Sequence, residues 1–148
     1  MGHERAVTRG LIAAAVLTIS LAGCGGEVAP EMAVRHSHGC VDDSVACISQ
    51  RQASLRGILA DPQRRWVRDP ADANAYATGV RLFAYKQKKR EMSCAELAHG
   101  RREADAGPAT LRGQSGRHLT PAQVSRGAML ATEVSRELQN EMKKRCPA

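Results

Sequence analysis

The sequence predicts an all-α fold, a small bundle of three to four helices that is stapled by disulfides. Four segments combine a helix-start signal with apolar residues at helical spacing. No segment alternates apolar and polar residues for long enough to form a strand. An even set of four cysteines is typical of a disulfide framework, and its members are Cys40, Cys47, Cys94 and Cys146.

The first helix is expected from about Asp43 to Ala60. Apolar residues recur there at spacings of three, four and seven and mark one helical face: Val41, Val45, Ile48, Leu55 and Leu59. Asp42 or Asp43 is expected to cap its start. Asp61-Pro62 is expected to end it, because a helical conformation is disfavoured for the residue before a proline.

A second helix is expected to begin at Asp69-Pro70, where an acidic N-cap precedes a proline at the first helical position. Its apolar stripe consists of Tyr76, Val80 and Phe83. Its last turns carry four cations, which suit the negative end of the helix dipole: Lys86, Lys88, Lys89 and Arg90.

Ser93 and Glu96 have the form of a capping box, which predicts a third, shorter helix to about Asp105. The alternative is that the second helix continues through this point. Residues 107–118 are rich in Gly, Pro and Ser, so a loop is expected there.

Thr120 and Gln123 form a second capping box, with a proline at the first helical position. The fourth helix is expected to end near Arg145. Its apolar face is predicted from Val124, Ala128, Ala131, Val134 and Leu138.

The apolar content is low for one domain. Only 17 of residues 41–148 are Val, Ile, Leu or Phe, about 16%, which is below the roughly 20% at which disorder is expected. Two disulfides would each add about 2–4 kcal/mol of stability. The single tryptophan, Trp66, is expected either to anchor the first inter-helix turn on the core or to stand exposed as an interface hot spot.

An up-down-up-down bundle with short connections would bring all four cysteines to one end. Three disulfide pairings are then possible. We favour pairings in which Cys40 and Cys47 each bond to one of Cys94 and Cys146, because these tie the first, third and fourth helices together. A bond between Cys40 and Cys47 would close only a small local loop and contribute less.

Cations gather near the same predicted end: Lys86, Lys88, Lys89, Arg90, Lys143, Lys144 and Arg145. One interpretation is that they complement helix C-termini and keep the protein soluble. The other is a basic patch that binds anionic groups. In this arrangement the chain before Cys40 leaves from the same end, so the patch would face a lipid surface. The alternative is that the tether before Cys40 lets the domain float clear of that surface.

The first 24 residues resemble the signal of bacterial lipoproteins. Arg5 and Arg9 precede an apolar run over residues 11–22, which is shorter than the roughly 20 residues of a transmembrane helix. The run ends in Leu21-Ala22-Gly23-Cys24. This ending resembles a lipobox, which implies cleavage before Cys24, a diacylglyceryl lipid on that cysteine, and stable attachment to a membrane of the cell envelope.

The chain is therefore expected to consist of a signal peptide (1–23), a lipidated flexible tether (24–39) and a helical domain (40–148). Gly25 follows Cys24, and by the same resemblance this favours the outer membrane of a Gram-negative cell, facing the periplasm. The formal net charge of +7 falls to +6 once Arg5, Arg9 and Glu4 are removed.

Two short patterns could carry metal chemistry. His36 and His38 precede Cys40 and are weak candidates for zinc or copper ligands, but the cysteine is expected in a disulfide. Glu96 and His99 have the spacing of a bundle metal motif, yet such sites use several pairs and only one is present. No cofactor and no catalytic residue is predicted.

We expect a non-enzymatic envelope lipoprotein whose helical module binds a protein, or an anionic lipid or polysaccharide. One alternative is a metal-binding or enzymatic periplasmic lipoprotein that uses His36, His38 and perhaps His99; another is a hydrolase inhibitor that uses residues 107–118. CxxC spacing is absent, which weighs against a thioredoxin-like enzyme. Nucleic acid is not expected as a partner, because the chain has few aromatic residues for stacking.

Overall fold

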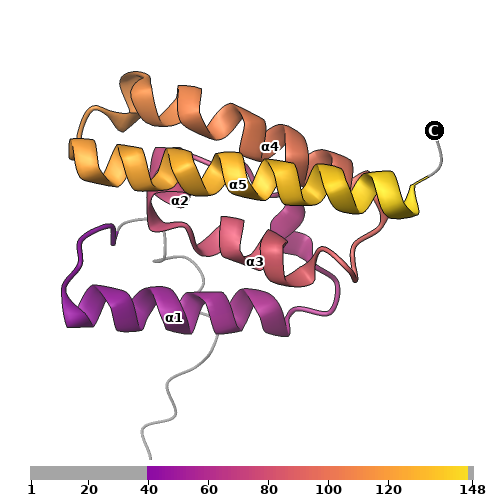
Figure 1. Ribbon diagram of the computed structural model, residues 1–148. Helices are drawn as coiled ribbons and strands as arrows, with labels where there is room; N and C mark the ends of the chain where they lie inside the picture. The colour runs from indigo at the N-terminus through magenta and orange to yellow at the C-terminus, as the bar shows by residue number, and fades with distance from the viewer. Residues whose placement is uncertain (1–39, 147–148) are drawn as a thin grey trace, which may run out of the picture.

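A computed structural model describes residues 40–146 and confirms the all-α class, with no strand in that range. Five α-helices and two short 3-10 helices follow one another (Figure 1): α1 (Val45–Ala60), η1 (Arg65–Arg68), α2 (Ala73–Thr78), α3 (Val80–Lys88), α4 (Cys94–Arg112), η2 (Gln114–Gly116) and α5 (Pro121–Arg145). The predicted signal, Cys24 and the tether with its two histidines lie outside the described residues. None of the described helices has the length and apolar character needed to cross a membrane.

The helices do not alternate in direction, so the up-down-up-down prediction was wrong. α1, α3 and α5 run the same way and α4 runs against them (Figure 1). Ion pairs show the parallel alignment of α3 and α5, because Lys86 contacts Glu133 and Lys89 contacts Glu137. The reason is the segment 61–72, which returns the chain to the end where α1 began before α2 and α3 are formed.

The disulfides are Cys40–Cys47 and Cys94–Cys146, so the favoured pairing was wrong. The number of disulfides was correct. Because α1 starts at the opposite end of the bundle from the start of α4, no bond can reach from Cys40 or Cys47 to the other pair. One bond closes a local loop before α1, and the other joins the start of α4 to the end of α5.

The predicted cap and apolar stripe of α1 are only partly confirmed. Ser44 caps the helix, rather than Asp42 or Asp43, by accepting a hydrogen bond from the amide of Cys47. Val45 of the stripe is 86% exposed, whereas Cys47 and Ser54 are the buried residues of α1. Val41, Leu55 and Leu59 of the stripe are partly buried and pack against the core, and the helix packs mainly on α3.

The predicted second helix is broken in two at Gly79, which has a φ of 71°. A side chain there would be strained, and a Cβ atom would lie 2.9 Å from Leu130. The helix also begins later than expected, because Asp72 and not Asp69 accepts the capping hydrogen bond, at 2.7 Å from the amide of Ala75.

Both predicted capping boxes are present, at Ser93 before α4 and at Thr120 before α5. The expected loop over residues 107–118 was wrong in its first half, since α4 continues through Pro108 to Arg112. Gly107 is buried against Ala131 and Tyr76, and this packing holds the helix together where a proline removes one backbone hydrogen bond. Only residues 113–120 join α4 to α5.

The core compensates for its low content of large apolar residues by close helix packing. α4 and α5 form the most extensive contact in the described part of the chain. At their contact, buried Gly107 of α4 lies against Ala131 of α5, and buried Gly127 of α5 lies against Leu111 of α4. Small side chains let two helices approach closely, which increases the number of van der Waals contacts per residue.

Gly100→Ala is expected to lower the free energy of unfolding by about 1–3 kcal/mol, because it overpacks the core. The added Cβ would lie 2.5 Å from the ring of Tyr85, which is fully buried. Urea unfolding followed by circular dichroism measures the change. Gly57→Ala is the matched control, because nothing lies within 4 Å of its Cβ position and alanine should stabilise that helix by about 0.8–1 kcal/mol. Equal effects of the two substitutions would contradict this account.

Candidate functional site

The seven cations of the predicted basic patch, which we call the basic end, divide into paired and unpaired side chains. Four of them contact acidic side chains: Lys86 and Lys89 contact Glu137, Lys88 contacts Glu91 and Arg145 contacts Glu141. Hydrogen bonds to Glu133 and Glu137 raise the pKa of Lys86. Arg145 also donates to the carbonyls of Lys89, Arg90 and Met92 just after α3.

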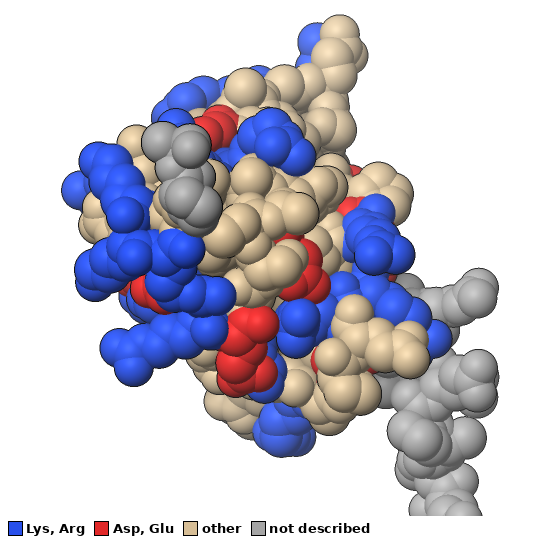
Figure 2. All heavy atoms as spheres, turned by 90° about the vertical axis from the view of Figure 1, so that its right-hand side faces the viewer, with Lys and Arg blue, Asp and Glu red and all other residues tan. Residues whose placement is uncertain are grey.

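The side chains of Arg90, Lys143 and Lys144 are exposed. Among residues 40–146 they have neither a hydrogen bond nor an ion pair. Figure 2 views the molecule from this end and shows Lys and Arg side chains gathered on one side of it, with acidic side chains beside them. The basic end therefore has three cations without a partner among residues 40–146.

The point where the predicted tether joins the domain lies at the other end of the bundle. Cys40 is bonded to Cys47 in the first turn of α1, and the carbonyl of Val41 accepts a hydrogen bond from Gln123 at the start of α5. Asp43 forms an ion pair with Arg126, one turn further along α5. The expectation that tether and basic end share one face was therefore wrong.

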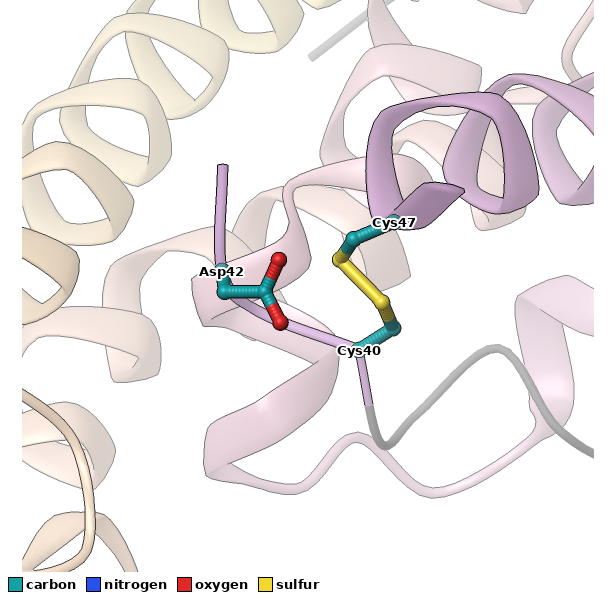
Figure 3. Close-up of side chains that lie close together, drawn as sticks. All are labelled: Cys40, Asp42 and Cys47. Carbon is teal, nitrogen blue, oxygen red and sulfur yellow. A yellow bond between two sulfur atoms is a disulfide. The ribbon is translucent and has the colours of Figure 1, made fainter. Parts of the chain in front are cut away.

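A cluster of metal-ligand types lies at the tether end, where Cys40, Asp42 and Cys47 bring their ligand atoms within 4.8 Å of one another. Figure 3 shows that the two sulfur atoms are bonded to each other, with the carboxylate of Asp42 beside them. Zinc and copper bind the thiolate form of cysteine, so the cluster cannot ligate a metal through sulfur in this oxidised form. His36 and His38 lie outside the described residues, and their metal role stays a prediction.

Glu96 and His99 do not form a joint metal site. Glu96 closes the capping box of α4 and accepts two hydrogen bonds from Arg64, at 3.0 and 3.2 Å. His99 lies instead beside Glu103, with 3.9 Å between Nε2 and Oε2. The expectation of a cap for Glu96 is confirmed, and His99 leads to a site that the sequence did not predict.

A buried ionic cluster lies between α3 and α4. Arg81 and Glu103 form an ion pair of 2.7 Å in which their side chains are only 6% and 8% exposed. The hydroxyl of Tyr85 donates to the same carboxylate oxygen, Oε2, at 2.9 Å. Burial raises the pKa of Tyr85, which keeps this hydroxyl protonated and able to donate. Trp66 packs edge-on against Tyr85, with 4.9 Å between ring centroids, so its role as a core anchor is confirmed.

Two buried polar atoms of this cluster lack a partner. Glu103 Oε1 accepts no hydrogen bond and Arg81 Nε donates none. The hydroxyl of Tyr76 is used elsewhere, since it donates to the backbone carbonyl of Glu103 at 3.0 Å. Burial raises the pKa of Tyr76 to about 12. Because buried polar groups are nearly always paired, an unpaired buried carboxylate oxygen is a feature that needs an explanation.

Glu103 of this cluster also lines a cavity of about 320 Å³ beside His99, which we call the His99 pocket. Its lining combines cations, acids, a histidine and a tyrosine from η1, the segment before α2, α2 and α4: Arg68, Asp69, Pro70, Ala71, Tyr76, His99, Arg102 and Glu103. The side chains of Arg68 and Arg102 have no ion pair or hydrogen bond within the described range. The pocket thus offers two free guanidinium groups near a buried carboxylate.

Only the pair His99 and Glu103, four residues apart on one helix, could have indicated this pocket from the sequence. No family model, curated protein or solved structure matches the chain.

Proposed function

We propose that this chain is a lipid-anchored protein of the cell envelope, attached through Cys24 to the periplasmic face of the outer membrane. Its helical domain is a non-enzymatic binding module. The basic end holds an anionic polymer of the envelope, such as the polysaccharide of the cell wall. The resemblance of residues 1–24 to a lipoprotein signal supports the anchor. The arrangement of the domain supports binding at the end that lies away from the anchor.

The observation that carries this proposal is the distance between the attachment point and the free cations. The chain enters the domain at the start of α1 and α5, whereas Lys143 and Lys144 lie in the last turn of α5. α5 has 25 residues, which at 1.5 Å each span roughly 37 Å. This exceeds the Debye length of about 8 Å at physiological salt several times over, so the basic end is free to bind a partner away from the anchoring membrane.

Lys143→Glu/Lys144→Glu is expected to weaken binding to purified cell-wall sacculi by about tenfold or more. Each cation lost beside an anionic surface removes about 1 kcal/mol of attraction, and two are reversed here. The measurement is co-sedimentation of the detergent-solubilised full-length protein at two salt concentrations. Binding of the unchanged protein should fall as salt rises.

Arg112→Glu/Arg117→Glu is the matched control, because it makes the same charge change at the other end of the bundle. It should leave binding within about twofold. Cys24→Ala should move the protein from the membrane to the soluble fraction while binding to sacculi persists. If the Lys143 and Lys144 variant sediments as well as the unchanged protein, the basic end is not the binding surface.

A further inference from the structure

We propose that Cys40, Asp42 and Cys47 form a zinc site that is available only when the disulfide between the two cysteines is reduced. The site uses two thiolate sulfurs and one carboxylate oxygen, a set of ligands that suits zinc rather than the harder Mg²⁺ and Ca²⁺. Oxidation of the two thiols closes the disulfide again and releases the metal. This inference is independent of the lipid anchor and of the basic end.

The three ligand atoms already lie close together. They are within 4.8 Å of one another, and the carboxylate of Asp42 lies beside the two sulfur atoms (Figure 3). Around a tetrahedral zinc, with bonds of about 2.3 Å to sulfur and about 2.1 Å to oxygen, ligand atoms lie about 3.6–3.8 Å apart. Once the bond between the sulfurs is broken, rotations of the Cys40 and Cys47 side chains reach this separation, since their Cα atoms are only 5.6 Å apart.

Contacts other than the disulfide hold the backbone around these ligands. The carbonyl of Val41 accepts a hydrogen bond from Gln123 at 3.0 Å, and the carbonyl of Asp42 accepts one from Arg51 at 3.0 Å. Oδ1 of Asp42 accepts from the amide of Ser44 at 2.8 Å. The second oxygen, Oδ2, has no hydrogen bond among the described residues and is left for a metal. The ligands therefore stay together when the disulfide opens.

Access to the site is through Cys40 and Asp42. Cys40 is half-buried and Asp42 is exposed, whereas Cys47 is 1% exposed. An incoming thiolate attacks the sulfur of Cys40, and the sulfur of Cys47 is the leaving group. The metal then binds between the two sulfurs, on the face of the Cys47 sulfur that the Cys40 sulfur occupies in the oxidised form. The low exposure of Cys47 is therefore no barrier to the metal.

The position of Cys47 favours the thiolate that zinc needs. Cys47 is the third residue of α1, a helix of 16 residues that starts after Ser44. The partial positive charge at a helix N-terminus stabilises a thiolate, which makes Cys47 a good leaving group and a good ligand.

The redox step is thiol–disulfide exchange, and the reductant is a protein dithiol. The dithiol gives up two electrons and two protons and forms its own disulfide, while Cys40 and Cys47 become thiols. Zinc then displaces the two thiol protons. The bond suits this exchange because it closes a loop between residues only 7 apart, so its opening costs less stability than opening the bond between residues 52 apart.

The test measures the zinc affinity of the detergent-solubilised full-length protein by competition with a chromophoric chelator. The oxidised protein and the protein reduced with a phosphine are compared. We expect the reduced protein to bind zinc at least about 100-fold more tightly, because the oxidised protein offers neither thiolate. In a second measurement, zinc is expected to protect Cys40 and Cys47 of the reduced protein from iodoacetamide. Mass spectrometry of the peptides should show Cys94 and Cys146 alkylated under the same conditions.

Asp42→Ala is expected to weaken zinc binding to the reduced protein by about tenfold or more, since it removes one ligand. Glu91→Ala is the matched control and should change the affinity by less than about twofold. It removes a carboxylate that is 56% exposed and pairs with Lys88 of the basic end. Cys40→Ser should weaken binding more than Asp42→Ala does, because thiolate is the stronger zinc ligand.

Equal zinc affinities of the oxidised and reduced protein would overturn the proposal. So would an unchanged affinity of reduced Cys40→Ser, because this variant keeps Cys94 and Cys146 and the metal would then lie on that pair. An unchanged affinity of Asp42→Ala would contradict a site of three ligands. Full alkylation of Cys40 and Cys47 in the presence of zinc would refute the site without any substitution, so this measurement does not depend on the folding of a variant.

Discussion

Arg81→Met is expected to lower the free energy of unfolding by about 3–5 kcal/mol, because it leaves the carboxylate of Glu103 buried without its cation. Both side chains of the pair are more than nine-tenths buried. Tyr85 alone would then hydrogen bond to that carboxylate. The loss is a large share of the 5–15 kcal/mol that stabilises a typical domain. Urea unfolding of the oxidised protein, followed by circular dichroism, measures it.

Arg101→Met, on α4, is the matched control. It removes an ion pair with Asp105 whose side chains are 40% and 52% exposed, so the expected loss is below about 1 kcal/mol. In the double variant Arg81→Met/Glu103→Leu both buried charges are gone, and most of the stability should return. A loss below about 1 kcal/mol for Arg81→Met alone would show that the pair is not a major source of stability.

Replacing Cys94 and Cys146 by Ala is expected to cost about 4 kcal/mol of stability. The bond joins residues 52 apart in the sequence, and the entropy that a disulfide removes from the unfolded chain grows with the length of the closed loop. It also holds the start of α4 to the end of α5, the two helices with the most extensive contact. Thermal and urea unfolding of the full-length protein measure the difference.

The Cys40→Ala/Cys47→Ala variant is the comparison. These residues are 7 apart, so the same relation predicts a loss of only about 2 kcal/mol. The critical result is which of the two variants loses more stability. A larger loss from opening the short loop would contradict an explanation based on loop closure.

The sequence correctly predicted features that depend on residues close together in the chain. It failed where contacts between segments far apart in the sequence determine the structure. Capping boxes at Ser93 and Thr120 marked two helix starts correctly, because each is made by side chains three residues apart. The disulfide pairing depended on the direction of α1, and therefore on the path of residues 61–72. No local pattern states that this segment runs back along the bundle.

Pro108 was placed in a loop because residues 107–118 are rich in Gly, Pro and Ser. Inside a helix, a proline removes one backbone hydrogen bond, which costs stability. The packing of Gly107 against Tyr76 and Ala131 outweighs that cost. Residue propensities for helix or loop do not include such tertiary contacts. The His99 pocket escaped prediction for a related reason. Arg81 and Glu103 are 22 residues apart and charged, and on an amphipathic helix such residues are expected to face water.

The way α1 is attached has a mechanical consequence. Cys47 and Ser54 are the buried residues of this helix. The Cys40–Cys47 bond links α1 to the chain before it rather than to the other helices, while α4 and α5 are covalently joined. A pulling force that enters the domain at Cys40 first loads the Val41–Gln123 hydrogen bond and the Asp43–Arg126 ion pair with α5, and then the contact of α1 with α3. α1 would then peel from α3 as a unit, while the disulfide between Cys94 and Cys146 keeps α4 and α5 joined.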